Sequence, residues 1–385
     1  MLSVDKIISA LDNNNIILGV FLDFSKAFDT IDHNIMLQKF DNYGIRGLAN
    51  KWFSSYLTDR CQYVSYNGSN SSRQNIVCGV PQGSILGPLL FLIYVNDLAL
   101  MCNNVLPIMY ADDSNLFKEG SDIIEMQNCV NEELQKISKW LKLNKLSLNI
   151  NKTHFIIFKR KRKVLNISPS LHIDSQPISQ VSNTKFLGVY IDENLSWQTH
   201  IDHISMKIAR GIGILRKARQ FLNKATVLQL YYTFVYPYLS YCNIIWGNAY
   251  STYLYKIVIM QKRIVRIIEN TKFRAPTAEL FNKLNILKCK SIFKYQVGQF
   301  IYKHTENMLP PLFSYLFVLR SSIHNYSTRY NSEYATWPFA IELTKRSLRY
   351  DGIVFWNSLS SDIKKCPSHN SFKFNLKKFL ILDQL

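Results

Sequence analysis

Short apolar runs and helical spacing of apolar residues alternate in the first part of the chain. Residues 16–24 read IILGVFLDF, a continuous apolar run that predicts a buried strand ending at Asp23. The next segment changes to helical spacing, and Asp32 stands where the N-cap of that helix would lie. Residues 48–57 predict a second helix, and Asn67-Gly68 is a strong signal for a hairpin turn.

The pattern continues with a glycine- and proline-containing loop that becomes an apolar helix over residues 81–100. Residues 108–117 predict two short strands, and residues 122–146 predict an amphipathic helix whose apolar residues recur every three or four positions. Residues 153–158 and 185–192 predict further strands. The first half therefore predicts an α+β fold, with mostly antiparallel strands and helices on one face.

After about residue 197 the strand signals fade and helical patterns dominate. Residues 200–222, 257–268 and 292–304 predict helices, although Gly211 and Gly213 weaken the first of these predictions. Proline-containing stretches at 272–280 and 308–313 predict loops or joints. We divide the chain accordingly, and the three predicted domains are 1–197, 198–305 and 306–385.

The stretch between Lys224 and Lys256 carries no charge, which raises the question of a membrane span. It contains Pro237, Gly247 and many polar residues, whereas a spanning helix needs roughly 20 predominantly apolar residues. We interpret it as a buried helical hairpin and expect no membrane partner. Its tyrosines, between 231 and 255, suit a core or base stacking, and we favour the core.

Charge is unevenly distributed along the 385 residues, which carry a net charge of +19. Residues 1–120 hold 8 Lys/Arg and 11 Asp/Glu, whereas residues 121–385 hold 38 and 16. An acidic front and a basic back indicate metal-binding carboxylates in one part and a polyanionic partner in the other. The seven cysteines are scattered and never form a C-x-x-C pattern, which favours an intracellular protein, in the nucleus or cytoplasm, without structural zinc.

Two adjacent aspartates, Asp112 and Asp113, interrupt the apolar run IMYADDSNLF. Holding two carboxylates side by side in such a run is expensive unless something compensates their charge. Asp23 ends another apolar strand 89 residues earlier, and strands that far apart in sequence can be neighbours in an α+β sheet. Divalent metal ions would neutralise the three carboxylates, and such a site suits phosphoryl transfer.

Three motifs in this order carry a resemblance to a known family: FLDFSKAFDTIDH around Asp23, GVPQGSILGPLLF at 79–91, and YADD at 110–113. They resemble reverse transcriptases, most closely those of non-LTR (LINE-type) retrotransposons. The resemblance runs from about residue 16 to 197 and implies a right-hand polymerase palm, followed by a helical thumb and a C-terminal helical region. It also implies an RNA-directed DNA polymerase with an RNA template, a DNA primer and deoxynucleoside triphosphates.

The same resemblance implies a role for individual residues. Asp23, Asp112 and Asp113 would hold two Mg²⁺ ions, for which Mn²⁺ can substitute, with the backbone carbonyl of Phe24 as a further ligand. The other implied roles are a gate against ribonucleotides at Phe28, contacts along the nucleotide and template base at Gln82 and Gly83, proton donation to pyrophosphate at Lys152, and a primer-grip turn at Leu187 and Gly188.

Basic residues of the predicted helix at 200–222 fit a nucleic-acid channel where a thumb would follow the palm. Contacts of this kind with phosphates give affinity without reading sequence. The residues concerned are Lys207, Arg210, Arg216, Lys217 and Arg219. The basic run at 159–163 is interpreted as a charged loop after a strand. A nuclear localisation signal or a contact with the template are the alternatives.

The sequence departs from the family pattern upstream of Asp23, where a fingers region and an endonuclease would stand. We therefore expect a fragment, truncated at its N-terminus, whose oligomeric state stays open. The alternative is a catalytically silent, nucleic-acid-binding relic of such an enzyme. A nucleotide cyclase on a palm-like fold is disfavoured, because it would need neither the PQGSILGP loop nor a basic thumb.

Overall fold

The computed structural model describes residues 1–165, 167–323 and 333–384, which form two compact units. We call Asn14–Leu187 the sheet unit, and Met1–Asn13 together with Gly188–Leu385 the helical unit. These limits differ from the predicted division at 197 and 305. The first helix groups with the C-terminal part of the chain, and the first boundary falls within the stretch 185–192 that was predicted as a strand.

The sheet unit contains a five-stranded sheet, several short strand pairs and four α-helices among its described residues. Its elements are β1 (Ile16–Leu22), α2 (His33–Asn42), α3 (Leu48–Leu57), β2 (Arg60–Gln62), β3 (Ser65–Tyr66), β4 (Ser69–Asn70), β5 (Gln74–Ile76), α4 (Leu86–Val95), the 3₁₀ helix η1 (Asn96–Met101), β6 (Leu106–Tyr110), β7 (Asp113–Gly120), α5 (Ile123–Leu143), β8 (His154–Phe158), β9 (His172–Ile173), β10 (Gln176–Pro177), β11 (Ser179–Gln180) and β12 (Asn183–Phe186).

The buried strand β1 lies at the centre of the sheet, whose order is β11-β8-β1-β7-β6. It pairs antiparallel with β7 on one side and with β8 on the other, and β6 pairs antiparallel with β7. Only β11 runs parallel to its neighbour β8 among these pairs. The register places Leu22 opposite Ser114, so the residues that follow β1 meet the beginning of β7. The predicted antiparallel α+β fold is confirmed for this unit.

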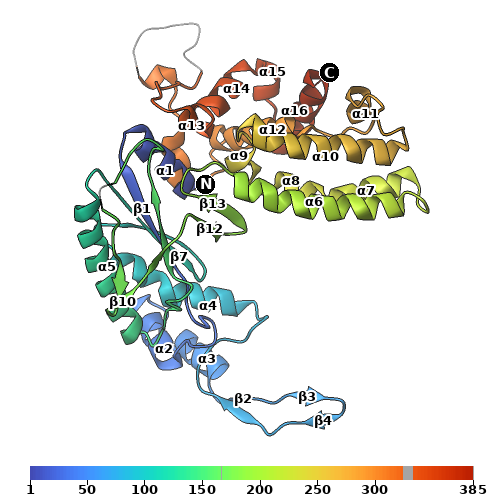
Figure 1. Cartoon of the computed structure of the whole chain (residues 1–385). Coiled ribbons are helices and arrows are strands. Elements are labelled where there is room, and N and C mark those ends of the chain that lie inside the picture. Colours follow the sequence, from blue (N-terminus) through green and yellow to red (C-terminus); the bar gives the residue numbers. More distant parts are fainter. Residues whose placement is uncertain (166, 324–332, 385) are drawn as a thin grey trace. The chain divides into compact units, whose positions relative to one another are not determined.

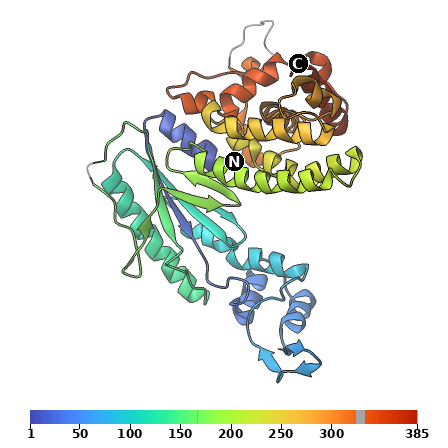
Figure 2. The ribbon, with the colours of Figure 1, turned by 45° about the vertical axis from the view of Figure 1, so that its right-hand side comes forward.

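Helices α2, α4 and α5 cover one face of the sheet. Alternate residues of β1 (Leu18, Val20) share a hydrophobic core with Phe40 of α2, Phe91 of α4 and Leu134 of α5. Figures 1 and 2 show α5 lying along the sheet in both views. The predicted N-cap is present, because Asp32 accepts a hydrogen bond from the Ile35 amide, and so is the predicted hairpin turn, where Asn67 and Gly68 both have positive φ.

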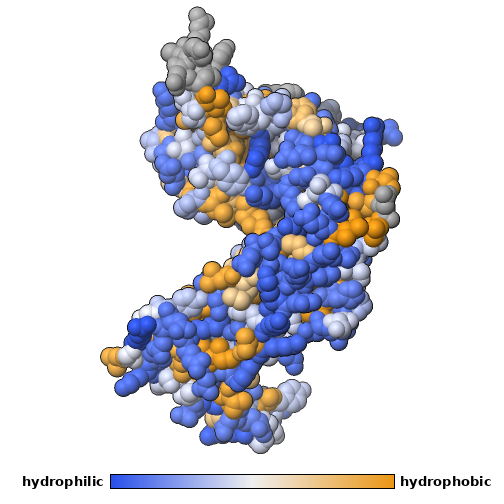
Figure 3. Space-filling model, turned by 90° about the vertical axis from the view of Figure 1, so that its left-hand side faces the viewer, coloured by the Kyte–Doolittle hydropathy of each residue, from blue (hydrophilic) through white to orange (hydrophobic). Residues whose placement is uncertain are grey.

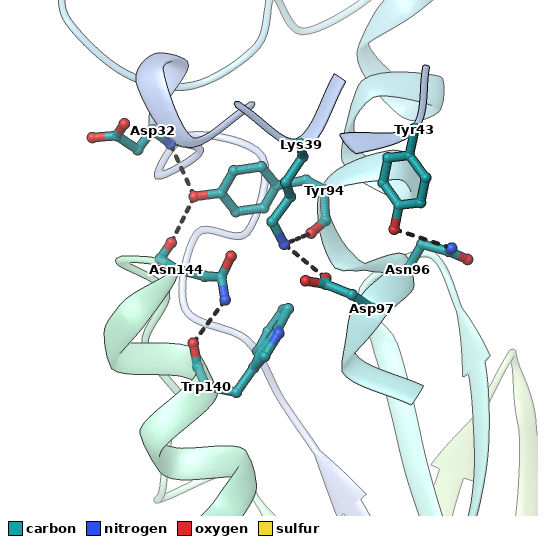
Figure 4. A network of polar contacts seen from close by, with 8 residues as sticks. All are labelled: Asp32, Lys39, Tyr43, Tyr94, Asn96, Asp97, Trp140 and Asn144. Atoms are coloured by element: carbon teal, nitrogen blue, oxygen red, sulfur yellow. Dashed lines mark hydrogen bonds and ion pairs between the residues drawn. The ribbon is translucent and has the colours of Figure 1, made fainter. Parts of the chain in front are cut away.

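A buried polar network joins α2, α4 and α5 inside this unit (Figure 4). The Lys39 ammonium donates to the Tyr94 carbonyl at 2.6 Å and to the Asp97 carboxylate at 2.7 Å. The Tyr94 hydroxyl donates to the Asn144 carbonyl at 2.6 Å, and burial raises the pKa of Tyr94 to about 12. Burial also lowers the pKa of Lys39, against the opposing effect of Asp97. A lysine in a core is tolerated only when paired in this way.

The helical unit has mostly α-helices among its described residues. Its elements are α1 (Leu2–Asp12), β13 (Val189–Asp192), α6 (Gln198–Ala218), α7 (Lys224–Phe234), α8 (Tyr236–Ser240), α9 (Asn243–Trp246), α10 (Ser251–Glu269), α11 (Ala278–Lys283), α12 (Cys289–Thr305), the 3₁₀ helices η2 (Pro311–Leu316) and η3 (Arg320–Ser322), α13 (Glu342–Lys345), the π-helical turn η4 (Leu348–Gly352), α14 (Ile353–Ser358), α15 (Ser361–Lys364) and α16 (His369–Asp383).

The three helices predicted after residue 197 are present as α6, α10 and α12. Helix α6 continues through Gly211 and Gly213. A Cβ at Gly211 would lie 2.8 Å from a methyl group of Val235, so this glycine allows the chain after α7 to approach the helix closely. The sequence analysis treated Gly211 only as a residue that disfavours a helix and missed this packing role.

The uncharged stretch after Lys224 was wrongly predicted as a hairpin of two buried helices. It forms the separate helices α7, α8 and α9, and the chain leaves helical geometry between them. Pro237 stands in the first turn of α8, and Cys242 adopts a left-handed conformation with φ of 49°. None of the described helices is long and apolar enough to cross a membrane.

The tyrosines of this stretch were also wrongly assigned to the core as a group. Tyr231 is fully buried, but Tyr232, Tyr238, Tyr250 and Tyr255 are all more than a third exposed. Helical spacing shows which residues share one face of a helix, but it identifies the buried face only when the element packed against that helix is known.

Hydrophilic residues predominate on the face shown in Figure 3, and hydrophobic residues form separate patches on it. This fits the composition, in which 19% of residues are charged and 47% are apolar.

Candidate active site

The three predicted aspartates lie at one end of the central strands. Asp23 follows the last residue of β1. Asp112 lies in the two-residue turn between β6 and β7, and Asp113 begins β7. Ala111, the other turn residue, has a φ of 52°, a conformation that is uncommon for residues other than glycine, asparagine and aspartate. The antiparallel pairing of β1 with β7 thus brings together carboxylates that are 89 residues apart in sequence.

The charges of the three aspartates interact. The pKa of Asp113 is raised, first by partial burial of its carboxyl group and then by the negative charges of Asp112 and Asp23. A bound cation would reverse this mutual repulsion, so the carboxylate oxygens fit a divalent metal ion in charge and donor type. Across residues 1–165, 167–323 and 333–384, however, no three His, Cys, Asp or Glu side chains are gathered closely enough to hold a metal ion. The carboxylates are neighbours without forming a ready-made coordination shell.

Backbone hydrogen bonds hold Asp23 in place. The Asp23 carbonyl accepts from the Asn149 amide at 2.8 Å, and the Ser25 amide donates to the Ser147 carbonyl at 2.9 Å. These two bonds do not use the carbonyl of Phe24, which the sequence assigned as a metal ligand. Lys152, predicted to serve the triphosphate, lies with its ammonium 4.0 Å from the Asp23 carboxylate in an exposed position. The structure therefore brings Asp23 and Lys152 together.

Phe28 lies in the turn that follows Asp23. Its ring is half-buried, with the centroid 4.6 Å from that of Phe91 in α4. Its carbonyl accepts from the Val80 amide at 2.9 Å, which ties this turn to the loop before α4. Phe28 thus has a packing role, and its partly exposed ring stays available for the predicted role as a gate.

Gln82 and Gly83 lie on the loop before α4, and both are exposed. The Gln82 side-chain amide donates to the Asp29 carboxylate at 2.9 Å, which fixes its direction. Gly83 has a φ of +81°, and a Cβ there would meet no atom within 4 Å. The glycine is therefore required by the left-handed backbone of the loop, and nothing in the protein crowds the space beside it.

A pocket of about 790 Å³ lies beside Gln82, and we call it the Gln82 pocket. It is lined in part by Lys26, Asp29, Arg60, Gly79 and Gln82. Gly79 has a φ of +84°, and a Cβ there would lie 2.8 Å from the Asp29 carbonyl, so only glycine lets the two segments meet. The sequence analysis missed Lys26, Asp29 and Arg60. The second aspartate of FLDFSKAFD was the available signal for Asp29, whereas Arg60 reaches the pocket only through the β2–β5 pairing.

The predicted primer-grip residues form the two-residue turn between β12 and β13. Leu187 and Gly188 have φ of 45° and 79°. The predicted turn is present, although residues 185–192 form two strands around it rather than one. A Cβ at Gly188 would lie 3.5 Å from the ring of Tyr241.

The five basic residues predicted to bind nucleic acid lie on or next to α6. Lys207, Arg210, Arg216 and Lys217 belong to the helix, and Arg219 is its C-cap. Arg216 and Arg219 line a pocket together with residues of α10, and Lys207, Arg210 and Lys217 are not part of its lining. Figures 1 and 2 show α6 and α10 side by side.

Comparison with known proteins agrees with this geometry. Residues 5–191 match the family described as "Reverse transcriptase (RNA-dependent DNA polymerase)". The chain is 26% identical over 291 residues to a "Probable RNA-directed DNA polymerase from transposon X-element" of Drosophila melanogaster, covering 74% of this chain and 32% of the relative. It is 28% identical to the "RNA-directed DNA polymerase from mobile element jockey" of Drosophila funebris, covering 73% and 31%. The chain thus spans about a third of the length of these curated relatives.

Among solved structures, the chain is similar to telomerase from Candida tropicalis in complex with a fragment of telomeric RNA. The TM-score is 0.38 with 11% sequence identity, covering 77% of this chain and 50% of the telomerase chain. A likeness this weak does not establish a shared fold, so the assignment depends on the family match and on the order of the motifs. Residues 5–191 therefore belong to the reverse transcriptase (RNA-dependent DNA polymerase) family.

Proposed function

We propose that the sheet unit is the catalytic domain of an RNA-directed DNA polymerase from a non-LTR retrotransposon. One observation carries the proposal. The pairing of β1 with β7 places Asp23, Asp112 and Asp113 at adjoining strand ends, inside a domain of the reverse transcriptase family. The pKa of Asp113 is raised first by partial burial and then by the charges of Asp112 and Asp23, which fits a site where a cation would offset negative charge.

Membership of the reverse transcriptase family indicates a requirement for divalent metal ions. We assign two Mg²⁺ ions to this site, with Mn²⁺ as a substitute. Asp23, Asp112, Asp113 and the carbonyl of Phe24 would hold them. When bound, such a pair of ions activates the attacking hydroxyl and stabilises the leaving oxygen of a phosphoryl transfer. The partners would be an RNA template, a DNA primer and deoxynucleoside triphosphates.

The chain's own residues would then orient the nucleotide and handle its leaving group. Lys152 is close enough to Asp23 to deliver a proton to pyrophosphate near the metal site. Gln82, held by Asp29, presents its amide beside the Gln82 pocket, where Lys26 and Arg60 offer positive charge to phosphates. The basic residues of α6 would contact the backbone of the primer–template duplex.

Primer extension on an RNA template tests the proposal. The assay uses a DNA primer, deoxynucleotides and Mg²⁺ or Mn²⁺, with the chain alone and with the chain joined to the upstream segment of a longer relative. We expect weak extension by the chain alone, clear extension by the fusion, and at least a 100-fold loss in both forms for Asp112→Ala/Asp113→Ala. Robust extension by this double variant would contradict the assignment.

A catalytically silent, nucleic-acid-binding relic is the second candidate. It is favoured by the absence of a gathered metal-binding cluster among the described residues. The two candidates separate in the same assay. Retained binding of primer–template by a fusion that never extends it identifies the relic.

Phe28 provides a test of how the site selects its sugar. Phe28→Val should lower the preference for deoxynucleotides over ribonucleotides by about tenfold or more, because it removes the wall nearest the 2′ position. Incorporation of deoxynucleotides should change little, and Phe28→Tyr should keep the preference. Single-nucleotide incorporation measures both quantities, and an unchanged preference in Phe28→Val would limit this residue to its packing against Phe91.

A further inference from the structure

A second pocket, of about 610 Å³, lies in the helical unit where α6 and α10 end. We call it the arginine pocket. It is lined by Arg216 and Arg219 from the end of α6, by Arg263 and Arg266 from α10, and by Phe273 from the loop after α10. No motif of the sequence analysis predicted it, since the two arginine pairs are 47 residues apart.

The positive charges of this pocket are uncompensated. None of the four arginines forms an ion pair with a carboxylate in the part of the chain that the structure describes. The nearest acidic residue of α10 in sequence, Glu269, is already paired with Lys224 and Lys283. The Arg219 Nε is buried without a hydrogen-bond partner among the described residues, and its Nη1 reaches only the Leu222 carbonyl, at 3.5 Å.

Local structure holds the guanidinium groups in place. Each helix presents two arginines three residues apart, a spacing that puts both on one side of the helix. Arg266 donates from Nε to the Ala275 carbonyl at 2.8 Å, which leaves its other guanidinium nitrogens available to a ligand. Arg216 and Arg266 lie in the last turns of their helices, where the helix dipole stabilises a cation.

An aromatic side chain accompanies the charges. The Phe273 side chain is 78% exposed, although a phenylalanine normally buries its ring. Arginine forks recognise phosphate oxygens in pairs, and exposed aromatic rings stack on unpaired bases. A pocket of this volume lies within the usual range for ligands of nucleotide size.

We propose that the arginine pocket binds single-stranded nucleic acid, with a backbone phosphate between the two arginine pairs and an adjacent base on Phe273. This inference rests on the nucleic-acid binding proposed above and specifies which form of nucleic acid the pocket binds. A duplex can contact the arginines through its phosphates, but its bases are already stacked on each other and offer no free face to Phe273, so the ring adds affinity only for a single strand.

Fluorescence anisotropy tests the pocket with two labelled probes, a single-stranded oligouridylate and a blunt RNA duplex of equal length. The binding buffer contains EDTA and no deoxynucleotides, so the result does not depend on polymerase activity. Arg216→Ala/Arg263→Ala should weaken binding of the single strand at least 20-fold. The matched control Lys262→Ala/Lys272→Ala removes two exposed charges next to pocket residues and should weaken it less than threefold.

Replacing Phe273 distinguishes binding of a single strand from binding of a duplex. Phe273→Ala should weaken binding of the single strand about five- to tenfold and leave duplex binding unchanged, whereas Phe374→Ala, another exposed phenylalanine of this unit, should change neither. Equal losses for the arginine variant and its lysine control, or no selective loss for Phe273→Ala, would overturn the proposal. Circular dichroism confirms that each variant is folded. Primer extension that fails while pocket binding persists counts only against the polymerase assignment.

Discussion

The two units concentrate charges of opposite sign at their candidate binding sites. The sheet unit holds 18 Lys/Arg against 14 Asp/Glu, a net charge of +4, whereas the helical unit holds 28 against 13, a net charge of +15. In the sheet unit, Asp23, Asp112 and Asp113 are neighbours at the ends of β1 and β7, and partial burial together with the charges of the other two raises the pKa of Asp113. In the helical unit, four arginines gather around one pocket without carboxylate partners among the described residues. Each cluster is a local excess of charge that a partner of opposite charge would relieve, and on this basis we propose metal binding in the sheet unit and phosphate binding in the helical unit.

The two units also differ in the burial and pairing of a representative lysine. Lys39 in the sheet unit is buried and fully engaged by Tyr94 and Asp97. Lys256 in the helical unit pairs with Asp202 at the surface, where both side chains are largely exposed. A pair of the first kind organises a core, and a pair of the second kind contributes little to stability.

Salt dependence should give the largest contrast between the units. If all five basic residues of α6 contact phosphates, affinity for a primer–template duplex should fall about 500-fold between about 50 and 200 mM salt. Arg210→Ala/Arg216→Ala should reduce this fall to about 40-fold without changing sequence preference. Lys139→Ala, an exposed lysine on α5, should leave the salt dependence as it is. Affinity that does not respond to salt would exclude a backbone channel in the helical unit.

Replacing a lysine should separate the units by stability. Lys39→Met keeps the aliphatic stem but leaves Asp97 unpaired, so the free energy of unfolding should drop by about 2–3 kcal/mol. Lys256→Met breaks an exposed pair and should change it by less than about 0.5 kcal/mol. Urea denaturation followed by circular dichroism measures both changes, and hydrogen exchange locates the loss. Equal effects of the two variants would contradict the contrast.

The pH dependence of stability should show a small effect at Asp113. The folded protein holds the Asp113 proton more tightly than the unfolded chain, whose pKa is about 3.8, so stability falls as pH rises through the interval above 3.8. Asp113→Asn removes this loss and should raise Tm by about 1–2 °C at neutral pH, a small shift because the residue is exposed to solvent. The difference should vanish near pH 3.5, and thermal melts across this range would show it. A lower Tm for Asp113→Asn at neutral pH without metal would contradict the repulsion.

Sequence patterns predicted the local structure well wherever neighbouring residues decide it. Asp32 caps α2, Asn67-Gly68 forms its turn, and the apolar period of α5 matches its buried side. Periodicity and capping act over a few residues, so one segment contains the whole signal. The order of the strands around β1 was open, and the motif resemblance implied only that Asp23, Asp112 and Asp113 share one site within the sheet.

Features that depend on distant segments could not be predicted. Lys39 looks like an ordinary helical lysine until Asp97 and Trp140 enclose it, with the Trp140 ring centroid 4.9 Å from its ammonium. Arg263 becomes a pocket residue only because α10 packs beside α6. The uncharged stretch after Lys224 was interpreted as a buried helical hairpin, and it instead breaks where Pro237 and the left-handed Cys242 redirect the chain. Tertiary packing, which no single segment encodes, decides each case.

Manganese binding tests most directly whether Asp23, Asp112 and Asp113 form a divalent-metal site. Electron paramagnetic resonance of free Mn²⁺ during titration counts bound ions. The account predicts saturable binding that Mg²⁺ displaces, lost in Asp112→Ala/Asp113→Ala and kept in Glu125→Ala/Glu132→Ala, which removes two exposed carboxylates of α5 in the same unit. Equal Mn²⁺ binding by the wild type and the aspartate double variant would contradict it.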